Sequence, residues 1–223
     1  MTKTPYQPTE RRPIASRNLR VMLWLATQLV RLKVSANAIS VAGMFCAIFG
    51  GLASAATASW PEFDRLFWLS AAVLIQLRLL ANLLDGMVAI ESGQASAVGE
   101  LYNEVPDRVS DSALLIGAGY AAGGDIVLGF SAACVALFTA YVRAMGKAAG
   151  APSEFCGPMA KQQRMFVLTV LALFHGATPA AWQLRWHDWG FLAGGLAIII
   201  VLGTLTALRR LFRIAASLKR PHE

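Results

Sequence analysis

Charged residues are scarce in this sequence. Of its 223 residues only 15% are Asp, Glu, Lys or Arg, whereas 56% are hydrophobic, and soluble domains usually carry about 25% charge. The mean hydropathy is +0.52. This composition excludes an ordinary soluble domain, so we predict an all-α integral membrane protein without a separate soluble domain. The N-terminal stretch MTKTPYQPTERRPIASR also lacks an apolar core before a cleavage site, and we expect a cytosolic tail there, not a signal peptide.

Cysteine and histidine are too few and too scattered to indicate a thiol or imidazole site. Cys46 and Cys134 fall in apolar runs, Cys156 falls in a loop, and no CxxC motif is present. The sequence therefore gives no support to a disulfide framework or a zinc site. The three histidines have no ligand spacing, and we assign them no role.

Long apolar runs account for most of the chain. A membrane-spanning helix needs about 20 mostly apolar residues, and the sequence contains six runs of this kind. We therefore predict six transmembrane helices, at residues 37–56, 66–90, 98–121, 126–147, 162–180 and 190–211.

Residues 16–34 precede the first run and show a different pattern. Their apolar side chains recur at helical spacing, and several Arg and Lys residues lie among them. This pattern predicts an amphipathic helix on anionic headgroups, although a helix packed on the bundle fits it nearly as well. The predicted organisation is a tail with the amphipathic helix at 1–34, a membrane domain at 35–213 and a tail at 214–223.

Basic residues gather on one side of this topology. They occur in the N-terminal segment, in the loop between the fourth and fifth runs and after the last run, whereas the opposite loops offer only Arg65 and Arg185. The positive-inside rule therefore places both termini in the cytosol, at the cell membrane. This bias and an anionic lipid surface explain the net charge of +7, so we expect no nucleic acid partner.

The carboxylates are concentrated in one stretch, NLLDGMVAIESGQASAVGELYNEVPDRVSD, residues 82–111. It joins the second and third runs at the cytosolic face, where two helical stripes could face each other. Carboxylate and amide oxygens suit Mg²⁺ or Mn²⁺, and a cation would offset charge that is costly at membrane depth. The stripes consist of Asn82, Asp85 and Ala89 in the second run and Gly99, Asn103, Asp107 and Asp111 in the third.

Ion pairing is a simpler explanation for part of this charge. Glu104 and Arg108 are spaced i, i+4, and Arg108 and Asp111 are spaced i, i+3. For the glutamates of the stretch we favour pairing or simple exposure. That explanation applies less well to the Asn and Asp positions of the two stripes, because ionisable groups within spans are functional candidates by default.

The same stretch resembles the signature of the CDP-alcohol phosphatidyltransferase family. That signature is D-x-x-D-G-x-x-A-R, eight residues, then G-x-x-x-D-x-x-x-D; here it is N-L-L-D-G-M-V-A-I, eight residues, then G-E-L-Y-N-E-V-P-D. SANAIS, YVRAMGK and GPMAKQQR resemble other parts of the family pattern, so the resemblance covers about residues 35–165. Identity and spacing match at Asp85, Gly86, Ala89, Gly99 and Asp107, whereas Asn82, Asn103 and Ile90 depart from it.

The resemblance implies roles for these positions. Asn82, Asp85, Asn103 and Asp107 would hold one Mg²⁺ or Mn²⁺ ion, or a second with help from Glu104 or Asp111. Asp107 would also take the proton from the incoming alcohol. Gly86, Ala89 and Gly99 would lie against the cytidine nucleotide, although close helix packing explains Gly99 equally simply. The departures at Asn82, Asn103 and Ile90 predict weaker metal binding and altered nucleotide recognition.

The acceptor side of the predicted site is basic. Arg143, Lys147, Lys161 and Arg164 lie at the cytosolic ends of the fourth and fifth runs, where relatives that use phosphorylated acceptors place cations; positive-inside bias alone also explains them. Asn37 could face the same cleft or cap the first helix. Pro106 could bend its helix and free a carbonyl, or could mark a helix start.

The predicted function is transfer of a phosphatidyl group, or a similar substituted phosphate, from a CDP-linked lipid such as CDP-diacylglycerol to a small alcohol or phosphorylated alcohol. CMP is released at the cytosolic face, and the resemblance implies a homodimer. The alternatives are a non-catalytic relative that binds lipid or nucleotide or acts as a scaffold, and a small transporter. The transporter lacks the repeats that such folds often show.

Overall fold

The computed structural model describes residues 19–93 and 97–219, and helices dominate this part of the chain. Six long helices follow a shorter one, and each of the six apolar runs coincides with one long helix. Two short 3-10 helices and a two-stranded antiparallel hairpin complete the described chain. The elements are α1 (Arg20–Arg31), α2 (Ala36–Ser59), η2 (Pro61–Phe63), α3 (Asp64–Glu91), α4 (Ala97–Tyr120), α5 (Ile126–Ala148), α6 (Lys161–Ala177), η3 (Ala180–Trp182), β1 (Arg185–Trp186), β2 (Trp189–Gly190) and α7 (Phe191–Leu218).

Four helical segments among the described residues are long and apolar enough to cross a membrane: α2, the segment Pro61–Glu91 that contains α3, α5 and α7. This finding agrees with an all-α membrane protein. α4 is long enough, but its N-terminal half carries several charged residues, and α6 has 17 residues. The six-span topology therefore stays a prediction that depends on these two helices.

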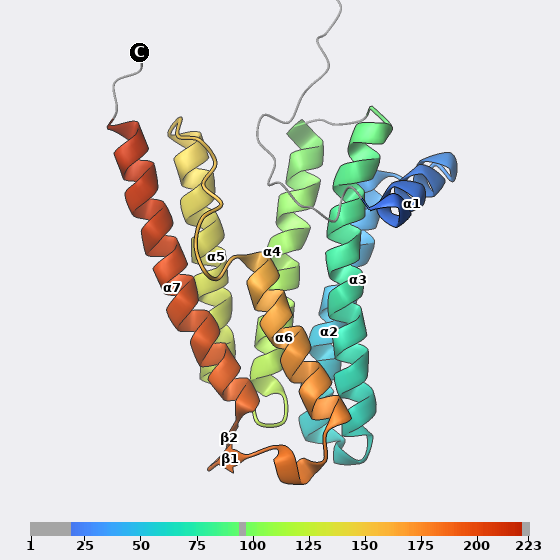
Figure 1. Cartoon of the computed structure of the whole chain (residues 1–223), viewed down its shortest axis with the longest axis vertical. Helices are drawn as coiled ribbons and strands as arrows, with labels where there is room; N and C mark the ends of the chain where they lie inside the picture. Colours follow the sequence, from blue (N-terminus) through green and yellow to red (C-terminus); the bar gives the residue numbers. More distant parts are fainter. Residues whose placement is uncertain (1–18, 94–96, 220–223) are drawn as a thin grey trace, which may run out of the picture.

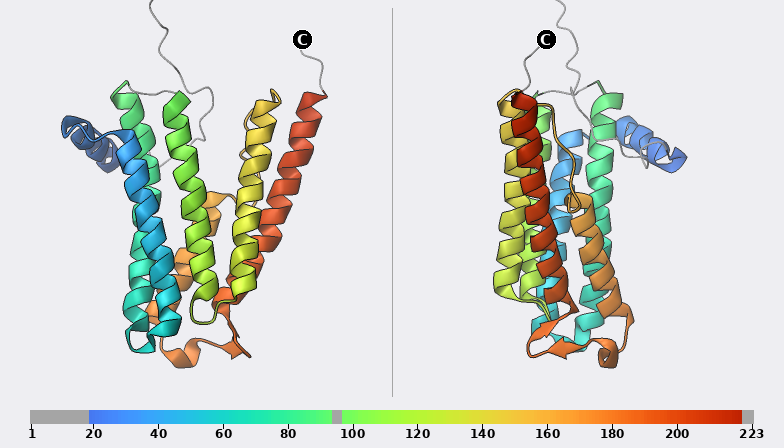
Figure 2. Two further views of the ribbon diagram at one scale, coloured as in Figure 1. Left: turned by 180° about the vertical axis from the view of Figure 1, so that it is seen from behind. Right: turned by 60° about the vertical axis from the view of Figure 1, so that its left-hand side comes forward.

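The long helices run roughly along one axis, and α1 projects to the side next to the upper part of α3 (Figure 1). α2 packs between α3 and α4, α5 packs on α4 and α7, and α6 packs on α3. The left-hand view of Figure 2, from behind, shows α5 and α7 as a pair beside α4. The main core cluster joins α2 to α7 through residues such as Ala47, Trp68, Leu115, Met165 and Leu196.

Close contact between α2 and α4 depends on small residues. A Cβ added to Gly117 would lie 2.3 Å from the carbonyl oxygen of Gly51, and one added to Gly51 would lie 2.3 Å from that of Ala113. Backbone atoms cannot move aside as a side-chain end can. Glycine at these positions therefore lets the two helices approach closely, as small residues commonly do in membrane bundles.

α1 packs on the bundle through one face and leaves the other exposed. Ala26 is fully buried against Leu84 and Val88 of α3, while the Thr27 hydroxyl donates a 2.8 Å hydrogen bond to Glu91. Trp24 is 60% exposed on the other face. The structure thus confirms contact with the bundle, and the exposed apolar face keeps the interfacial prediction open.

The connection between α5 and α6 turns back into the bundle before α6 begins (Figure 1). The Met159 amide donates a 2.9 Å hydrogen bond to the Thr206 hydroxyl, and Arg210 Nε donates one of 2.9 Å to the Cys156 carbonyl. Gly157 has φ +118°, and a Cβ there would lie 2.3 Å from Thr206 Cγ2. These contacts with α7 start α6 at the depth where Lys161 reaches α4.

Candidate active site

The Asp85 carboxylate lies between α2 and α3. Its side chain is buried, and Oδ2 accepts a 2.6 Å hydrogen bond from the Ser40 hydroxyl of α2. Arg78 lies two turns earlier on α3, and its guanidinium pairs with Asp107 of α4. α3 thus carries both Asp85 and the arginine that pairs with Asp107, and a shared site of the two acidic residues stays a prediction.

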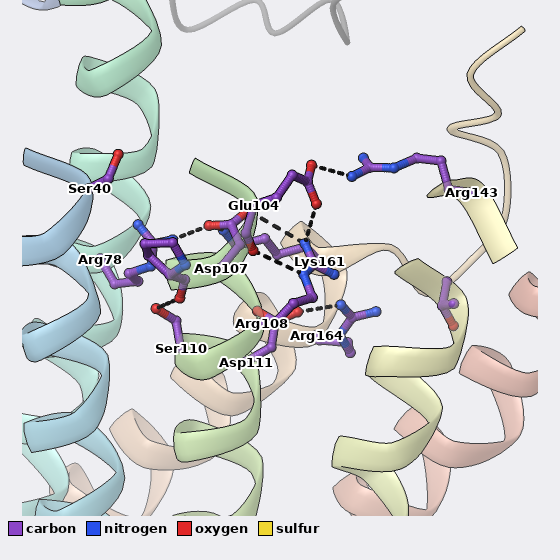
Figure 3. Close-up of polar contacts among 12 residues, drawn as sticks. Ser40, Arg78, Glu104, Asp107, Arg108, Ser110, Asp111, Arg143, Lys161 and Arg164 are labelled. Carbon is purple, nitrogen blue, oxygen red and sulfur yellow. Dashed lines mark hydrogen bonds and ion pairs between the residues drawn. The ribbon is translucent and has the colours of Figure 1, made fainter. Parts of the chain in front are cut away.

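Asp107 is held by cations from two other helices. Its Oδ1 pairs with Nη2 of Arg78 from α3 and, at 2.5 Å, with Nζ of Lys161 from α6. Its Oδ2 faces Arg108 at 3.7 Å. Asp107 and Arg78 are both buried, so this cluster connects α3, α4 and α6 in the interior of the protein (Figure 3).

Two further α4 carboxylates meet cations on either side of this cluster. Asp111 Oδ2 accepts a 2.6 Å hydrogen bond from Arg164 of α6, in a pair buried on both sides. Exposed Glu104 pairs with Arg143 of α5 and, at 3.4 Å, with Arg108. Figure 3 shows these side chains converging on the same stretch of α4. Three of the four basic residues predicted for acceptor binding therefore contact carboxylates of this stretch.

Several buried oxygens of the site have no hydrogen-bond partner within the described residues. They belong to the two stripes that the sequence placed face to face, and unpaired buried acceptors of this kind are costly unless a ligand satisfies them. Amide and carboxylate oxygens are also the donors that Mg²⁺ and Mn²⁺ accept. The atoms are Oδ1 of Asn82, Asp85, Asn103 and Asp111.

This donor set fits a divalent cation, although it is poor in charge. Residues 19–93 and 97–219 contain no group of three or more His, Cys, Asp or Glu side chains arranged to hold a metal ion. At positions 82 and 103 an amide oxygen stands where the motif has a carboxylate oxygen. The residues that would hold an ion are Asn82, Asp85 and Asn103, with Asp107 able to contribute its Oδ2.

The remaining predicted site residues lie on α3, α4 and α5. Gly86, Ala89 and Gly99 are half-buried on α3 and α4, so their contact with a nucleotide stays a prediction. Lys147 is exposed near the end of α5. Ile90, which replaces the motif's arginine, is 52% exposed.

Three alternative readings of the sequence are wrong. Asn37 does not cap α2, because Ser35 is the N-cap and accepts a 3.2 Å hydrogen bond from the Ala38 amide. Pro106 does not begin a helix, since it lies within α4 and is buried. The expected pairing of Arg108 with Asp111 is replaced by an ion pair between Asp111 and Arg164, because α6 brings a closer cation.

Two residues of the site received no role from the sequence. Ser40 belongs to the SANAIS segment, and Arg78 lies on the face of α3 that carries Asn82 and Asp85. An arginine within a run of apolar residues is itself a signal, since a charge at membrane depth is costly and needs a partner. Arg78 is 0% exposed, and Asp107 supplies that partner.

No protein-family profile matches the chain, but curated proteins do. A phosphatidylinositol phosphate synthase of Streptomyces avermitilis is 29% identical over 163 residues, which cover 70% of this chain and 64% of that protein. An archaetidylinositol phosphate synthase of Aeropyrum pernix is 28% identical over 169 residues, 74% of this chain and 80% of that protein. The inner membrane protein YnbA of Escherichia coli is 24% identical over 183 residues, 82% of this chain and 84% of that protein.

Solved structures share the fold. The chain resembles Mycobacterium tuberculosis phosphatidylinositol phosphate synthase with CDP-DAG bound at a TM-score of 0.71 and 18% identity, covering 92% of this chain and 100% of that one. The same enzyme in complex with manganese and citrate gives a TM-score of 0.70, covering 91% of this chain and 93% of that one. At this level of identity the comparison establishes a common helical architecture.

Proposed function

We propose that this protein transfers a phosphatidyl group, or a similar substituted phosphate, from a CDP-linked lipid to a hydroxyl of a small alcohol or phosphorylated alcohol, releasing CMP. The observation that carries the proposal is the set of buried, unpartnered oxygens on Asn82, Asp85 and Asn103, on the two helices that also carry Arg78 and its partner Asp107. The names of the relatives and the CDP-DAG-bound structure of the same fold support the reaction class.

Asp107 is the residue that would take the proton from the acceptor hydroxyl. Two cations hold its Oδ1, which fixes the carboxylate and leaves Oδ2 toward the side where Arg108 lies at 3.7 Å. Asp85, fixed by Ser40, would hold the diphosphate side through a cation. A bound Mg²⁺ or Mn²⁺ ion would stabilise the charge that develops on the departing CMP, and the manganese-bound relative supports this cofactor.

The acceptor is expected on the side of the site where α5 and α6 contribute cations. Lys161 and Arg164 reach α4 from the first turn of α6, and Arg143 reaches Glu104 from α5. A phosphorylated acceptor would exchange some of these carboxylate contacts for phosphate contacts. Relatives named as synthases of inositol phosphate lipids support testing phosphorylated polyols first.

The proposal includes the membrane arrangement. Six spans would place α1, the active site and the end of α7 at the cytosolic face, with α1 resting its exposed Trp24 side on the headgroups. Arg31, Lys33 and Lys147 lie at the end of the helical bundle where the site is, whereas the loops at the opposite end have few basic residues. This distribution supports the proposed orientation. The homodimer of the sequence prediction rests on the resemblance alone.

Release of CMP tests the reaction. Full-length protein in detergent with Mn²⁺ and CDP-diacylglycerol should release CMP when the right acceptor is supplied from a panel of free and phosphorylated polyols. Lipid analysis of deletion and overexpression strains should identify the same product. If no acceptor yields CMP and no cytidine nucleotide binds, the protein does not act on CDP-linked lipids.

The second candidate is a non-catalytic relative that binds lipid or nucleotide. It is favoured by the two amide positions of the site and by the cations that already neutralise Asp107. Nucleotide binding without turnover across the whole panel would establish it.

A further inference from the structure

Arg78 is a buried arginine with unused hydrogen-bond donors inside the proposed site. Its side chain is 0% exposed, and one nitrogen, Nη2, pairs with Asp107. Nε and Nη1 are also buried and have no partner within the described part of the chain. A guanidinium left in this state is costly, because each desolvated donor loses its hydrogen bonds to water. The arrangement therefore points to a ligand that supplies acceptor oxygens.

The surrounding helices make room for this guanidinium. Gly43 of α2 faces it, and a Cβ there would lie 3.0 Å from Arg78 Nη1 and 2.7 Å from the Ala81 Cβ. A larger residue would press on the nitrogen that lacks a partner. On α3, Asn82 follows Arg78 by one turn and Asp85 by two, so Arg78 lies on the motif's own face. The guanidinium is thus part of the oxygen-lined site.

Arg78 also affects the net charge of the site. In their ordinary charge states Asp85 and Asp107 carry two negative charges, and Arg78, Lys161 and Arg108 carry three positive charges, so these five side chains sum to +1. One divalent ion would balance a bound diphosphate. A second ion would leave excess positive charge among amide ligands, which is unfavourable in a buried site.

We propose that Arg78 takes the place of a second divalent ion in this site. Its Nε and Nη1 bind the diphosphate of the CDP-linked donor, and the site holds one divalent ion. Arginine suits this role because its planar fork matches pairs of phosphate oxygens and its charge is permanent. The pair with Asp107 holds the guanidinium in place. This inference rests on the proposed function for the identity of the ligand.

Binding measurements on the purified full-length protein test the proposal. We expect one Mn²⁺ per chain at saturating CDP, measured by the electron paramagnetic resonance of free Mn²⁺. Arg78→Gln should weaken CDP binding by about 10-fold or more, with a smaller loss for CMP, which lacks the diphosphate. Without nucleotide, the same variant should bind Mn²⁺ more tightly, because a like charge has been removed. A merely structural role would weaken both.

Two further variants keep the result interpretable. Arg213→Gln removes the same charge from α7, where Arg213 is 54% exposed and pairs with Glu154, and should change neither affinity. Arg78→Lys keeps the charge but lacks the two directed donors, so CDP binding should still fall; it decides the question if Arg78→Gln does not fold. Two Mn²⁺ per chain in the unaltered protein, or unchanged CDP affinity in the Arg78 variants, would overturn the proposal.

The two hypotheses fail in different ways. If the unaltered protein binds CDP with Mn²⁺ but releases no CMP from any acceptor, the proposed transfer reaction is wrong while the role of Arg78 in binding is still measured. If CMP is released and Arg78→Lys binds CDP as well as the unaltered protein does, the reaction stands and the role of Arg78 is wrong.

Discussion

The two halves of α4 differ in what they place against their neighbours. From Asn103 to Asp111 the helix offers polar groups, most of them buried or half-buried, and cations from three other helices pair with its carboxylates. From Ala113 to Gly119 it offers small residues that contact the backbone of α2 and α5 directly. The first half retains unpartnered oxygens, whereas the second half has no space for even a methyl group at Gly117.

This difference separates two tasks along one helix. Close glycine packing fixes the position of α4 relative to α2, because neither backbone can shift without a clash. The polar half can then carry buried polar groups without hydrogen-bond partners. The close packing of the other half of α4 offsets the free energy that these groups cost. Substitutions in the polar half should therefore affect binding and turnover more than stability, and substitutions in the packed half should do the reverse.

The largest expected effect is on turnover. Asp107→Asn keeps the shape and one acceptor oxygen but removes the base, so CMP release should fall by about 10²–10⁴-fold. The unfolding temperature should also fall, because Arg78 and Lys161 lose their charged partner. Asp125→Asn is a matched control, because Asp125 caps α5 at the other end of the bundle through a 2.8 Å bond from the Leu128 amide, and Asn caps equally well. Full activity of Asp107→Asn would remove Asp107 from the mechanism.

The packed half should respond in stability. Gly117→Ala forces a methyl group to 2.3 Å from a backbone oxygen of α2, and the resulting separation of the helices should cost about 3 kcal/mol. Thermal unfolding in detergent measures the change. Gly194→Ala on α7 is the control, since a Cβ there has nothing within 4 Å. Equal stability of the two variants would show that α2 and α4 can move apart freely.

Restoring the acidic motif should change metal binding by an intermediate amount. Asn82→Asp with Asn103→Asp adds two carboxylates beside the unpartnered oxygens, and Mn²⁺ affinity should rise by about 10-fold, because affinity follows ligand charge. Gln183→Glu adds negative charge near η3, at the far end, and should leave Mn²⁺ affinity unchanged. Weaker Mn²⁺ binding in the double variant would contradict a metal site between α3 and α4.

Much of the polar surface of α3 and α4 could be predicted, because it depends on the spacing of residues within a single helix. A spacing of three or four residues puts side chains on one helical face, and an apolar length of about 20 residues identifies a span. The sequence therefore predicts Asn82 and Asp85 on one face of α3 and Asn103 and Asp107 on one face of α4. The pair of Glu104 with Arg108 followed from the same local rule, and the structure confirms it.

The cations of the site depend on contacts distant in sequence, and these could not be predicted. Lys161 and Arg164 reach α4 because the loop before them is tied to Thr206 and Arg210 of α7. Residues 149–160 have no periodic pattern from which the position of the start of α6 in the bundle could be predicted. Arg78 was visible as a charge in an apolar run, but its partner lies 29 residues away on another helix.

The smallest expected effect concerns α1, which touches the polar end of the bundle from outside. Thr27→Val removes the hydroxyl that donates to Glu91 but keeps the side-chain volume. Because Glu91 is exposed and water can replace the donor, the loss should be about 0.5–1 kcal/mol, measured by thermal unfolding, with turnover unchanged. Thr204→Val, at an exposed position of α7, should have no effect. A large loss of CMP release in Thr27→Val would mean that the position of α1 controls the site, and that the division between binding and packing extends beyond α4.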